Sequence, residues 1–271
     1  DDSHKDNYFD YGYIGKFNQK LKNSYTFKKE EKYDVDGDGI IDTLWANFQD
    51  GFTKESLTFV PGTLNPTGTA YTTQFFANSD PAFITSLDDV QAGYALRNGD
   101  VARNVYSMWY NTGRQYRGNN LGEMSQTRVF ANFSADIKNH AIQVGFEFEQ
   151  RVQRQFNLIA LNELGGLWGQ MRQLANSHIS QLDSMPILNT DLSVNGELYY
   201  DFNRLNDGNQ TQFDRSLREK LGYDVNGLDW IDIDSYDPST FSLDMFSADD
   251  LLNQGNSPLI NYFGYTKEGK K

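Results

Sequence analysis

Residues 127–148 read TRVFANFSADIKNHAIQVGFEF, and apolar side chains recur at every second position along most of this stretch. Alternation with a period of two predicts β-strands, and Lys138-Asn139-His140 between the two runs predicts a tight turn. The side chains expected on the apolar face are Val129, Ala131, Phe133, Ala135, Ile137, Ile142, Val144, Phe146 and Phe148. We therefore expect a long β-hairpin over residues 124–156 with one apolar face and one polar face.

The length of this hairpin points to a membrane. Each arm is expected to reach about ten residues or more, whereas ordinary strands average about five or six. A strand of about ten residues can cross a bilayer at a tilt. Strands in soluble β-sandwiches also alternate, so the pattern by itself fits both settings. The length and the polar face favour a transmembrane β-barrel, in which Glu147 and Glu149 line a wet lumen and are not paired catalytic acids.

Composition excludes several classes of function. The chain has 271 residues, a formal net charge of −13 and no cysteine. Nucleic acid is not an expected partner, because phosphate binding needs clustered cations. Disulfides, zinc fingers, iron–sulfur clusters and thiol catalysis are excluded. Aromatic residues make up 14% of the chain although the mean hydropathy is −0.66, a combination typical of sugar-binding β surfaces and of transmembrane β-barrels.

The sequence on either side of the hairpin predicts further elements. Alternation predicts a strand with one wet face over Asp10–Lys22. No period is sustained between Lys29 and Glu123, where Thr58–Val60 and Thr69–Phe76 are expected as short strands. Apolar residues at helical spacing predict a long helix over Leu164–Leu182. The remaining expected elements are a helix over Thr211–Gly222, a helix over Ser247–Gln254 with a Ser247/Asp250 capping box, a small hairpin turning at Val194–Glu197 and a strand over Leu259–Thr266.

An acidic run, Asp34-Val35-Asp36-Gly37-Asp38-Gly39-Ile40-Ile41-Asp42, is the best candidate metal site. Asp at positions 1, 3, 5 and 9 with Gly at position 6 matches the start of a calcium-binding loop. The expected ligands are the carboxylates of Asp34, Asp36, Asp38 and Asp42 and the carbonyl of Ile40. Position 12 is Trp45, so a closing ligand would come from elsewhere, such as Asp50. The run predicts a structural Ca²⁺ site, with an acidic turn lacking a cation as the alternative.

Aromatic residues in loop-like sequence are candidates for ligand contact, because aromatic rings stack on sugars and pack against peptides. These residues are Trp45, Tyr106, Trp109, Tyr110 and Tyr116. A girdle at a membrane interface, or packing within the loop, would use the same side chains. The sequence does not choose between these uses.

No catalytic signature is present in the sequence. It contains no Gly-x-Ser-x-Gly elbow, no phosphate loop and no dinucleotide fingerprint. His4 lies in the polar start Asp1–Phe9, which is expected to be frayed, and His140 lies in the hairpin turn. His178 lies on the apolar stripe of the expected helix, where packing is its expected role. We therefore do not expect an enzyme.

Four strings carry a resemblance to a known family: RVFANFSADIKNHAIQVGFEFEQR (128–151), LWGQMRQLANSHI (167–179), YYDFNRLNDGNQTQFDRSLREKLG (199–222) and LDMFSADDLLNQGN (243–256). Over roughly residues 105–265 the chain resembles large TonB-dependent outer-membrane receptors of the Bacteroidota type, those with a carboxypeptidase-regulatory-like N-terminal domain. The resemblance implies a barrel of about 22 strands with an internal plug. It also implies energy from a periplasmic TonB protein and the import of a bound nutrient.

The resemblance implies a mainly β fold, in which a partial transmembrane β-barrel of antiparallel strands carries long extracellular loops with loop helices. Residues 1–28 would be a barrel strand region, 29–123 a long extracellular loop with the acidic motif, 124–156 the transmembrane hairpin, and 157–271 an extracellular loop region with helices and a small hairpin. The expected location is the bacterial outer membrane, with loops facing the cell exterior. The expected partners are membrane lipid, the plug and remaining barrel strands, the TonB protein and a surface lipoprotein.

The sequence also departs from the family. No plug sequence and no TonB-box-like start are visible, and 271 residues are too few for a barrel of that size with its plug. We therefore expect an internal fragment of such a receptor, completed by other polypeptide. Two other functions stay open, a soluble calcium-stabilised extracellular binding or adhesion module and a secreted hydrolase. A chain that is monomeric without detergent would favour the soluble module.

Overall fold

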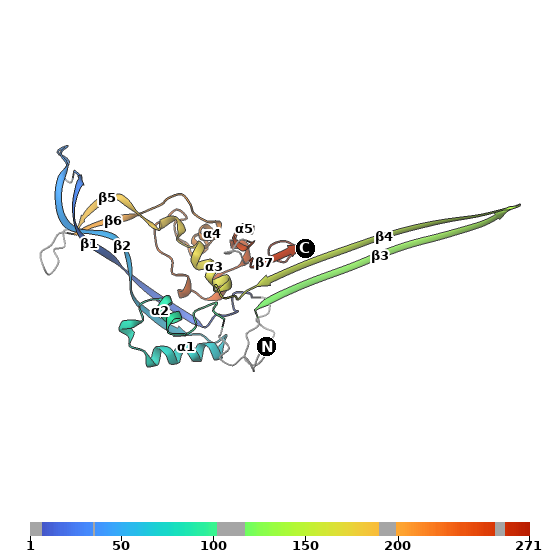
Figure 1. The fold of residues 1–271 in the computed structure, drawn as a ribbon, viewed down its shortest axis with the longest axis horizontal. Coiled ribbons are helices and arrows are strands. Elements are labelled where there is room, and N and C mark those ends of the chain that lie inside the picture. The colour runs from blue at the N-terminus through green and yellow to red at the C-terminus, as the bar shows by residue number, and fades with distance from the viewer. Residues whose placement is uncertain (1–6, 35, 102–116, 190–198, 253–257) are drawn as a thin grey trace.

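The computed structural model describes residues 7–34, 36–101, 117–189, 199–252 and 258–271, and the fold is mainly β with few helices (Figure 1). The strands are β1 (Gly15–Tyr33), β2 (Asp42–Pro61), β3 (Gly118–Ile137), β4 (His140–Ile159), β5 (Gln181–Asn189), β6 (Tyr199–Leu205) and β7 (Ile260–Phe263). The α-helices are α1 (Pro66–Asn78), α2 (Leu87–Ala92), α3 (Gly166–Leu174), α4 (Gln212–Leu221) and α5 (Ala248–Leu252). Short 3₁₀ turns are η2 (Pro81–Phe83), η4 (Ser177–Ile179), η5 (Ile233–Ser235), η6 (Pro238–Thr240) and η7 (Leu243–Met245).

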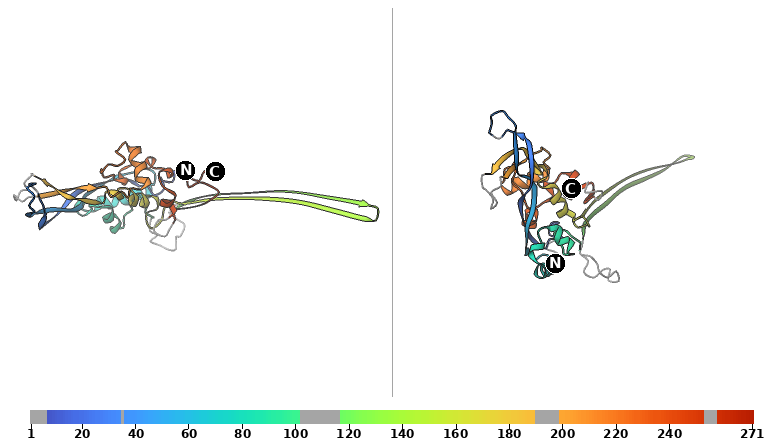
Figure 2. Two further views of the ribbon diagram at one scale, coloured as in Figure 1. Left: turned by 90° about the horizontal axis from the view of Figure 1, so that it is seen from above. Right: turned by 60° about the vertical axis from the view of Figure 1, so that its left-hand side comes forward.

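The molecule consists of a body and one long arm. The arm is the hairpin of β3 and β4, and it leaves the body in each of the three views (Figures 1 and 2). The two strands pair antiparallel from Gly118↔Ile159 to Ile137↔His140 without a register shift. Lys138 and Asn139 form the turn, with Lys138 at φ 54°. The predicted hairpin is therefore confirmed, and it extends beyond residues 124–156 at both ends.

The body is organised around a four-stranded sheet in the order β1-β2-β6-β5. The hairpin β1–β2 is antiparallel and carries three register shifts, while β6 joins β2 through a short parallel pairing. Phe48 stacks on Tyr200 across that junction, with ring centroids 5.0 Å apart. Helices α1 and α2 contribute to a second apolar cluster around Ile14 and Phe17 at the start of β1. Other elements of the body thus cover parts of β1 and β2 at these two places.

The main core lies where the arm meets the body. Phe156 and Leu158 at the end of β4 are fully buried together with Trp168 of α3 and Phe213 of α4. Phe9 belongs to this core and its carbonyl accepts a hydrogen bond from the Trp168 Nε1–H at 3.0 Å. The expectation that the segment through Phe9 is frayed is therefore wrong at Phe9. Buried aromatic contact holds it in place.

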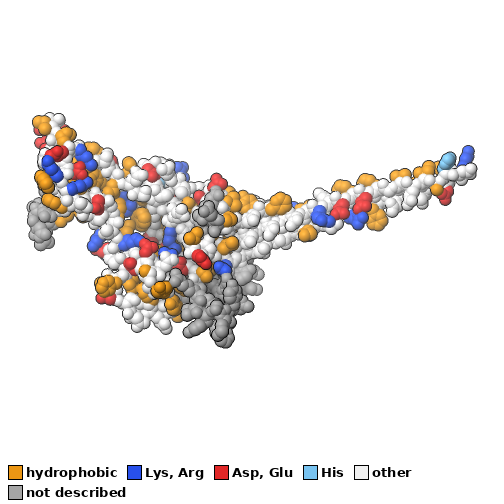
Figure 3. Space-filling model, in the orientation of Figure 1, with side chains coloured by type: hydrophobic (Ala, Val, Ile, Leu, Met, Phe, Trp, Pro, Cys, Tyr) orange, Lys and Arg blue, Asp and Glu red, His pale blue; other side chains and the backbone are white. Residues whose placement is uncertain are grey.

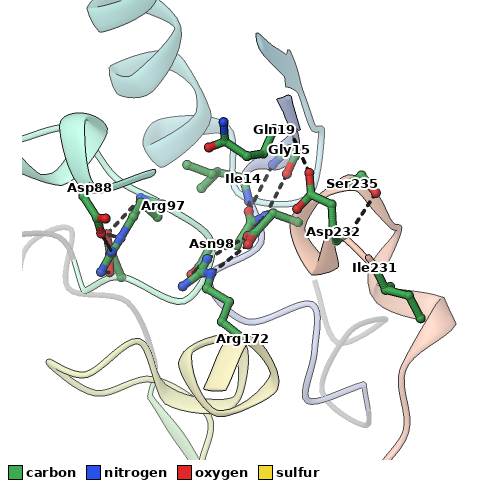
Figure 4. A network of polar contacts seen from close by, with 12 residues as sticks. Ile14, Gly15, Gln19, Asp88, Arg97, Asn98, Arg172, Ile231, Asp232 and Ser235 are labelled. Carbon is green, nitrogen blue, oxygen red and sulfur yellow. Dashed lines mark hydrogen bonds and ion pairs between the residues drawn. The ribbon is translucent and has the colours of Figure 1, made fainter. Parts of the chain in front are cut away.

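A polar network ties the start of β1 to the rest of the body (Figure 4). The Asn98 amide accepts from the Ile14 N–H and donates to the Gly15 carbonyl, both at 2.9 Å. It also donates to Asp234, which pairs with Arg172 through two hydrogen bonds of 2.7 Å. The side chains join four segments that are distant in sequence, and their buried groups are satisfied by one another. Such a network fixes the position of β1 more narrowly than apolar contact does.

Two predicted elements are wrong. Residues 69–76 lie in helix α1, in which Pro66 occupies the first turn and pre-sets a helical φ. The hydroxyls of Thr69 and Thr72 donate to the carbonyls of Ile14 and Leu96. These buried hydrogen bonds to other segments stabilise the two threonines inside a helix, although β-branched residues have a low helix propensity.

The second wrong prediction is the long helix over Leu164–Leu182. Helix α3 ends at Leu174 because Asn176 adopts a left-handed conformation at φ 59°. The Asn176 side chain donates to the Ile231 carbonyl and accepts from the Ile231 N–H, which stabilises the break. Pro186 does not end a helix but lies in β5 beside a register shift, where a missing N–H is tolerated.

The other predicted elements are confirmed in type where they fall on described residues. Thr211 caps α4 and Gly222 ends it at φ 76°. Ser247 and Asp250 form the reciprocal capping box of α5, with bonds of 2.9 and 3.1 Å. The last strand is shorter than expected, since β7 covers Ile260–Phe263 only. Strands β5 and β6 pair antiparallel, and the turn predicted at Val194–Glu197 lies outside the described residues.

Candidate functional site

The arm separates its side chains by polarity over most of its length. Phe133 is 66% exposed, and its cross-strand partner on the same face is Val144. The large apolar side chains of this face are Val129, Phe133, Ile137, Ile142, Val144, Phe146 and Phe148, all exposed. Hydrophobic side chains recur along the projecting arm in Figure 3. An apolar face of this extent on an element that the body does not cover indicates a binding surface.

The opposite face of the arm is mainly polar and carries ion pairs, although Phe130 and Met124 lie on it and are 70% and 69% exposed. The Arg128 Nη2 lies 2.7 Å from the Glu147 Oε1, and the Arg151 Nη2 lies 3.0 Å from the Glu149 Oε1. The Gln126 amide also donates to Glu149 at 2.9 Å. These contacts confirm that Glu147 and Glu149 lie on the polar face. Glu147 and Glu149 are not arranged as a pair of catalytic acids, because each carboxylate has its own cationic partner.

Both edges of the arm lack strand partners among the described residues for most of their length. Strand β3 forms one edge of its sheet, and β7 pairs with β4 only along Gln155–Leu158. Neither β3 nor β4 contains Pro or Lys, and their pairing contains no bulge. Natural edge strands use these features to block further pairing. Over most of its length, neither edge of the arm is closed by another described strand.

At its base the arm changes from exposed to anchored. Glu123 on β3 faces Arg154 on β4 with 3.2 Å between the charged atoms, and Lys271 lies 2.8 Å from the same carboxylate oxygen. The hydrogen bond from Lys271, together with Arg154, lowers the pKa of Glu123. Beyond this pair, Phe156 and Leu158 on the same face enter the core. The apolar face thus has a polar collar between it and the body.

The acidic run forms the tip of the β1–β2 hairpin. The Gly37 and Gly39 N–H groups donate to the two oxygens of Asp34 at 2.8 and 2.9 Å. Gly39 has φ 85°, a conformation in which other residues are strained. Carboxylate oxygens of Asp34, Asp36 and Asp42 lie within 4.8 Å of one another. That arrangement brings three of the five predicted ligands to one point that can hold a hard cation.

The two remaining predicted ligands are not part of this group. Asp38 accepts from the Ile40 N–H at 2.7 Å, so its carboxylate is turned to its own loop backbone. Ile40 is exposed, and the proposed contribution of its carbonyl stays a prediction. Asp50, suggested as a closing ligand, accepts from Ser24 and Thr26 farther down the hairpin. The hydrogen bonds to Asp34 occur both in an acidic turn without a cation and in a calcium loop. The bound cation therefore stays a prediction.

Of the aromatic candidates, Trp45 is described and is 62% exposed on β2. Its ring lies 6.3 Å from that of Phe27 on the neighbouring strand. Tyr106, Trp109, Tyr110 and Tyr116 lie outside the described residues. The sequence reasoning missed Phe27, although its alternation with Tyr25 along β1 would have placed it on the same outer face. Trp45 and Phe27 form an exposed aromatic pair near the acidic tip.

Sequence reasoning also missed a hollow of about 500 Å³ lined by Asp10, Tyr13, Lys16 and Asp237 among others. Lys16 Nζ lies 2.7 Å from Asp237 Oδ2. Burial, then the charge and hydrogen bond of Asp237, raise the pKa of Tyr13 to about 12. No local signal could have found this site, because its walls come from residues more than two hundred positions apart. His178, by contrast, is fully buried as predicted.

No protein-family model, curated protein or solved structure matches this chain. In the described part of the chain, no helix has the length and apolar character needed to cross a bilayer.

Proposed function

We propose that the β3–β4 arm is a section of the wall of a transmembrane β-barrel, and that the chain is a segment of an outer-membrane receptor of the TonB-dependent type. The observation that carries this proposal is the exposed arm itself, apolar on one face and ion-paired on the other. In such a barrel the apolar face meets lipid and the polar face meets the lumen.

The extent of the apolar face supports this function. From Val129 to Ile137 the strand rises about 27 Å at ~3.4 Å per residue. At a strand tilt of about 35–45° this rise becomes roughly 20 Å, close to the ~25 Å apolar band of outer-membrane barrels. The flanking positions Thr127 and Gln150 are polar, as is the turn at Lys138 and Asn139. Polar residues thus bound the face where headgroups and water would begin.

The open edges of the arm supply the second support. In a barrel, each wall strand pairs on both sides, so the edges of β3 and β4 would be closed by the other barrel strands of the receptor. The body and the Lys138-Asn139 turn then lie on opposite sides of the membrane. In the family that the sequence resembles, the side of the body is the cell exterior. The surfaces of the body, including Trp45, would capture a nutrient ligand or a surface lipoprotein, while the plug and the periplasmic TonB protein drive uptake.

Single cysteines test which face meets lipid, since the chain has none of its own. We would place them at Phe133 and Val144 on the apolar face, and at Ser134 and Gln143 on the polar face as matched controls. A polarity-sensitive fluorophore on each is read with the chain in lipid vesicles. We expect blue-shifted emission, quenched by lipid-borne nitroxides, at the first pair only. Equal emission at all four positions would contradict a lipid-facing wall.

Behaviour without detergent separates this proposal from a soluble calcium-stabilised binding or adhesion module. Sedimentation in detergent-free buffer is expected to show association of the native chain. Replacing Phe133, Val144 and Phe146 by Ser, Thr and Ser is expected to reduce it. A native chain that sediments as a single monomer, with no lipid quenching in the cysteine experiment, would support the soluble module.

We also propose that the acidic tip binds Ca²⁺ in a structural role, with Asp34, Asp36 and Asp42 as ligands. The three convergent carboxylates support it, because oxygen ligands suit Ca²⁺ and uncompensated carboxylates repel one another. The cation would rigidify the tip that carries Trp45 and Phe27. Calorimetric titration with calcium, and with magnesium for comparison, tests it.

A further inference from the structure

Arg204 on β6 is a half-buried cation that no carboxylate of the described residues pairs with. Its Nη1 group donates to the Ile179 carbonyl at 3.2 Å, which is a neutral acceptor. Burial lowers the pKa of Arg204, and no acidic neighbour acts to raise it. Charges that are taken out of water are normally paired with an opposite charge, because an unpaired ion loses its hydration without compensation. The charge of Arg204 lacks such a partner within the described chain.

Two other arginines show how this chain usually balances a desolvated guanidinium group. Arg218 is fully buried, and its Nε lies 2.8 Å from an oxygen of Asp214. Arg172 donates two hydrogen bonds of 2.7 Å to Asp234. In both cases a carboxylate of the same chain accepts the charge-assisted hydrogen bonds. The contrast with Arg204 indicates that its carboxylate partner is supplied from outside the described residues.

Aromatic rings orient Arg204 without neutralising it. The Cζ atom of Arg204 lies 3.6 Å from the ring centroid of Phe52 on β2 and 5.0 Å from that of Trp230. Stacking on an aromatic face restricts the side chain but leaves the N–H groups free, because these lie in the plane of the guanidinium group. The three residues come from three separate segments of the body. The cation is therefore held in a fixed place with its donors still available.

The donors of Arg204 suit a carboxylate. A guanidinium group has five N–H donors, and among the described residues the Ile179 carbonyl is the acceptor that Arg204 has. Two N–H groups on one edge match the two oxygens of a carboxylate in a bidentate pair. The Trp230 side chain is 45% exposed, so it offers apolar surface beside this edge. The net charge of −13 does not prevent such binding locally, since no acidic group acts on Arg204.

We propose that Arg204 binds the carboxylate of an organic acid through its guanidinium edge, and that Trp230 contacts the apolar part of the same ligand. The site belongs to the body, so it is independent of whether the arm faces lipid. A small aryl acid and the carboxyl-terminal residue of a peptide offer the same chemistry.

Calorimetric titration of the full chain with 3-phenylpropionate, at low ionic strength and in one non-ionic detergent throughout, tests the proposal. We expect saturable binding that is about tenfold or more weaker in Arg204→Gln, because the charge-assisted bonds are lost. Arg204→Lys keeps the charge but not the bidentate edge, and should weaken binding several-fold. Arg215→Gln is the matched control, since Arg215 is exposed on α4 and its removal changes the net charge equally.

Trp230→Ala tests the apolar part of the site and leaves the arginine in place, so it serves even if Arg204→Gln does not fold. It should weaken binding of 3-phenylpropionate several-fold and leave binding of acetate unchanged. Equal weakening of both acids would overturn the proposed role of Trp230. The carboxylate site itself would be overturned by a native chain without saturable binding, by equal weakening in Arg204→Gln and Arg215→Gln, or by tighter binding of inorganic phosphate.

Titration with Nα-acetylphenylalanine identifies the source of the carboxylate. An affinity at least equal to that of 3-phenylpropionate assigns the site to the carboxyl terminus of a peptide. A several-fold lower affinity assigns it to a small aryl acid.

Discussion

Two long hairpins of nearly equal length dominate this chain, and they differ in almost every other respect. β1–β2 contains three register shifts, and its inward side chains lie in two apolar clusters. β3–β4 pairs residue by residue without a shift and leaves its apolar face exposed. Bulges increase the local twist of a strand pair and bend it. The first hairpin carries these irregularities and lies within the body, whereas the second is regular and projects from it.

The comparison shows that strand length and alternation do not by themselves determine the setting of a hairpin. β1–β2 gains its cover from parts of the same chain, namely α1, α2 and the segment around η5. The arm gains cover from none of these except at its base, where Phe156 and Leu158 enter the core. Each hairpin has apolar side chains to bury, and in the arm the proposed cover is lipid.

The largest expected difference between the hairpins is in the cost of removing an aromatic ring. Phe17 on β1 is fully buried, whereas Phe133 on β3 is 66% exposed. Phe17→Ala is expected to lower the free energy of unfolding by about 3–5 kcal/mol, and Phe133→Ala by less than about 0.5 kcal/mol in detergent. Urea unfolding followed by tryptophan fluorescence measures both. Equal losses would show that the arm folds back onto the body in solution.

The hairpin tips provide the next comparison, because β1–β2 ends in the acidic run and β3–β4 in Lys138-Asn139. Calcium at about 100 times its Kd is expected to add ~2.7 kcal/mol to the free energy of unfolding. Asp34→Asn should abolish this gain, while Asp136→Asn, beside the other tip, should leave it unchanged. Thermal unfolding with calcium or EDTA is the measurement. An unchanged midpoint in both solutions would leave only an acidic turn.

The arm could be predicted from sequence in detail, and the body only in part. Alternation is a local signal, so the faces and turn of β3–β4 follow from the residues themselves. In the body, distant contacts override the local pattern. Asn176 breaks the expected helix because its amide bonds to Ile231, and Thr69 and Thr72 enter a helix because their hydroxyls reach carbonyls of other segments. The acidic run was predictable from its spacing, but the hollow was not, since it depends on how three segments meet.

The acid dependence of stability separates the covered hairpin from the exposed one. Asp232 accepts from the Gln19 N–H of β1 at 2.8 Å, and burial, the largest influence, raises its pKa to about 6. A carboxyl whose folded pKa is raised contributes stability that is fully present below its unfolded value of about 4 and is lost as the pH rises through about 6. The contribution of Asp232 therefore falls by roughly 2.7 kcal/mol over this window. Asp232→Asn should remove that part of the slope in pH-dependent urea unfolding. A slope unchanged in the variant would show that Asp232 is solvated in the native chain.

The smallest expected effect concerns the polar face of the arm. Arg128 and Glu147 are 2.7 Å apart, but both side chains are more than half exposed. Exposed ion pairs contribute about 0–1 kcal/mol, because water screens the charges and ordering two long side chains costs entropy. Arg128→Gln should therefore change the free energy of unfolding by less than about 0.5 kcal/mol in detergent, with Arg151→Gln as the neighbouring control. A loss several times larger would mean that water is excluded from this face. The polar face would then be a contact surface like the covered side of β1–β2, and the proposed wet lumen would have to be abandoned.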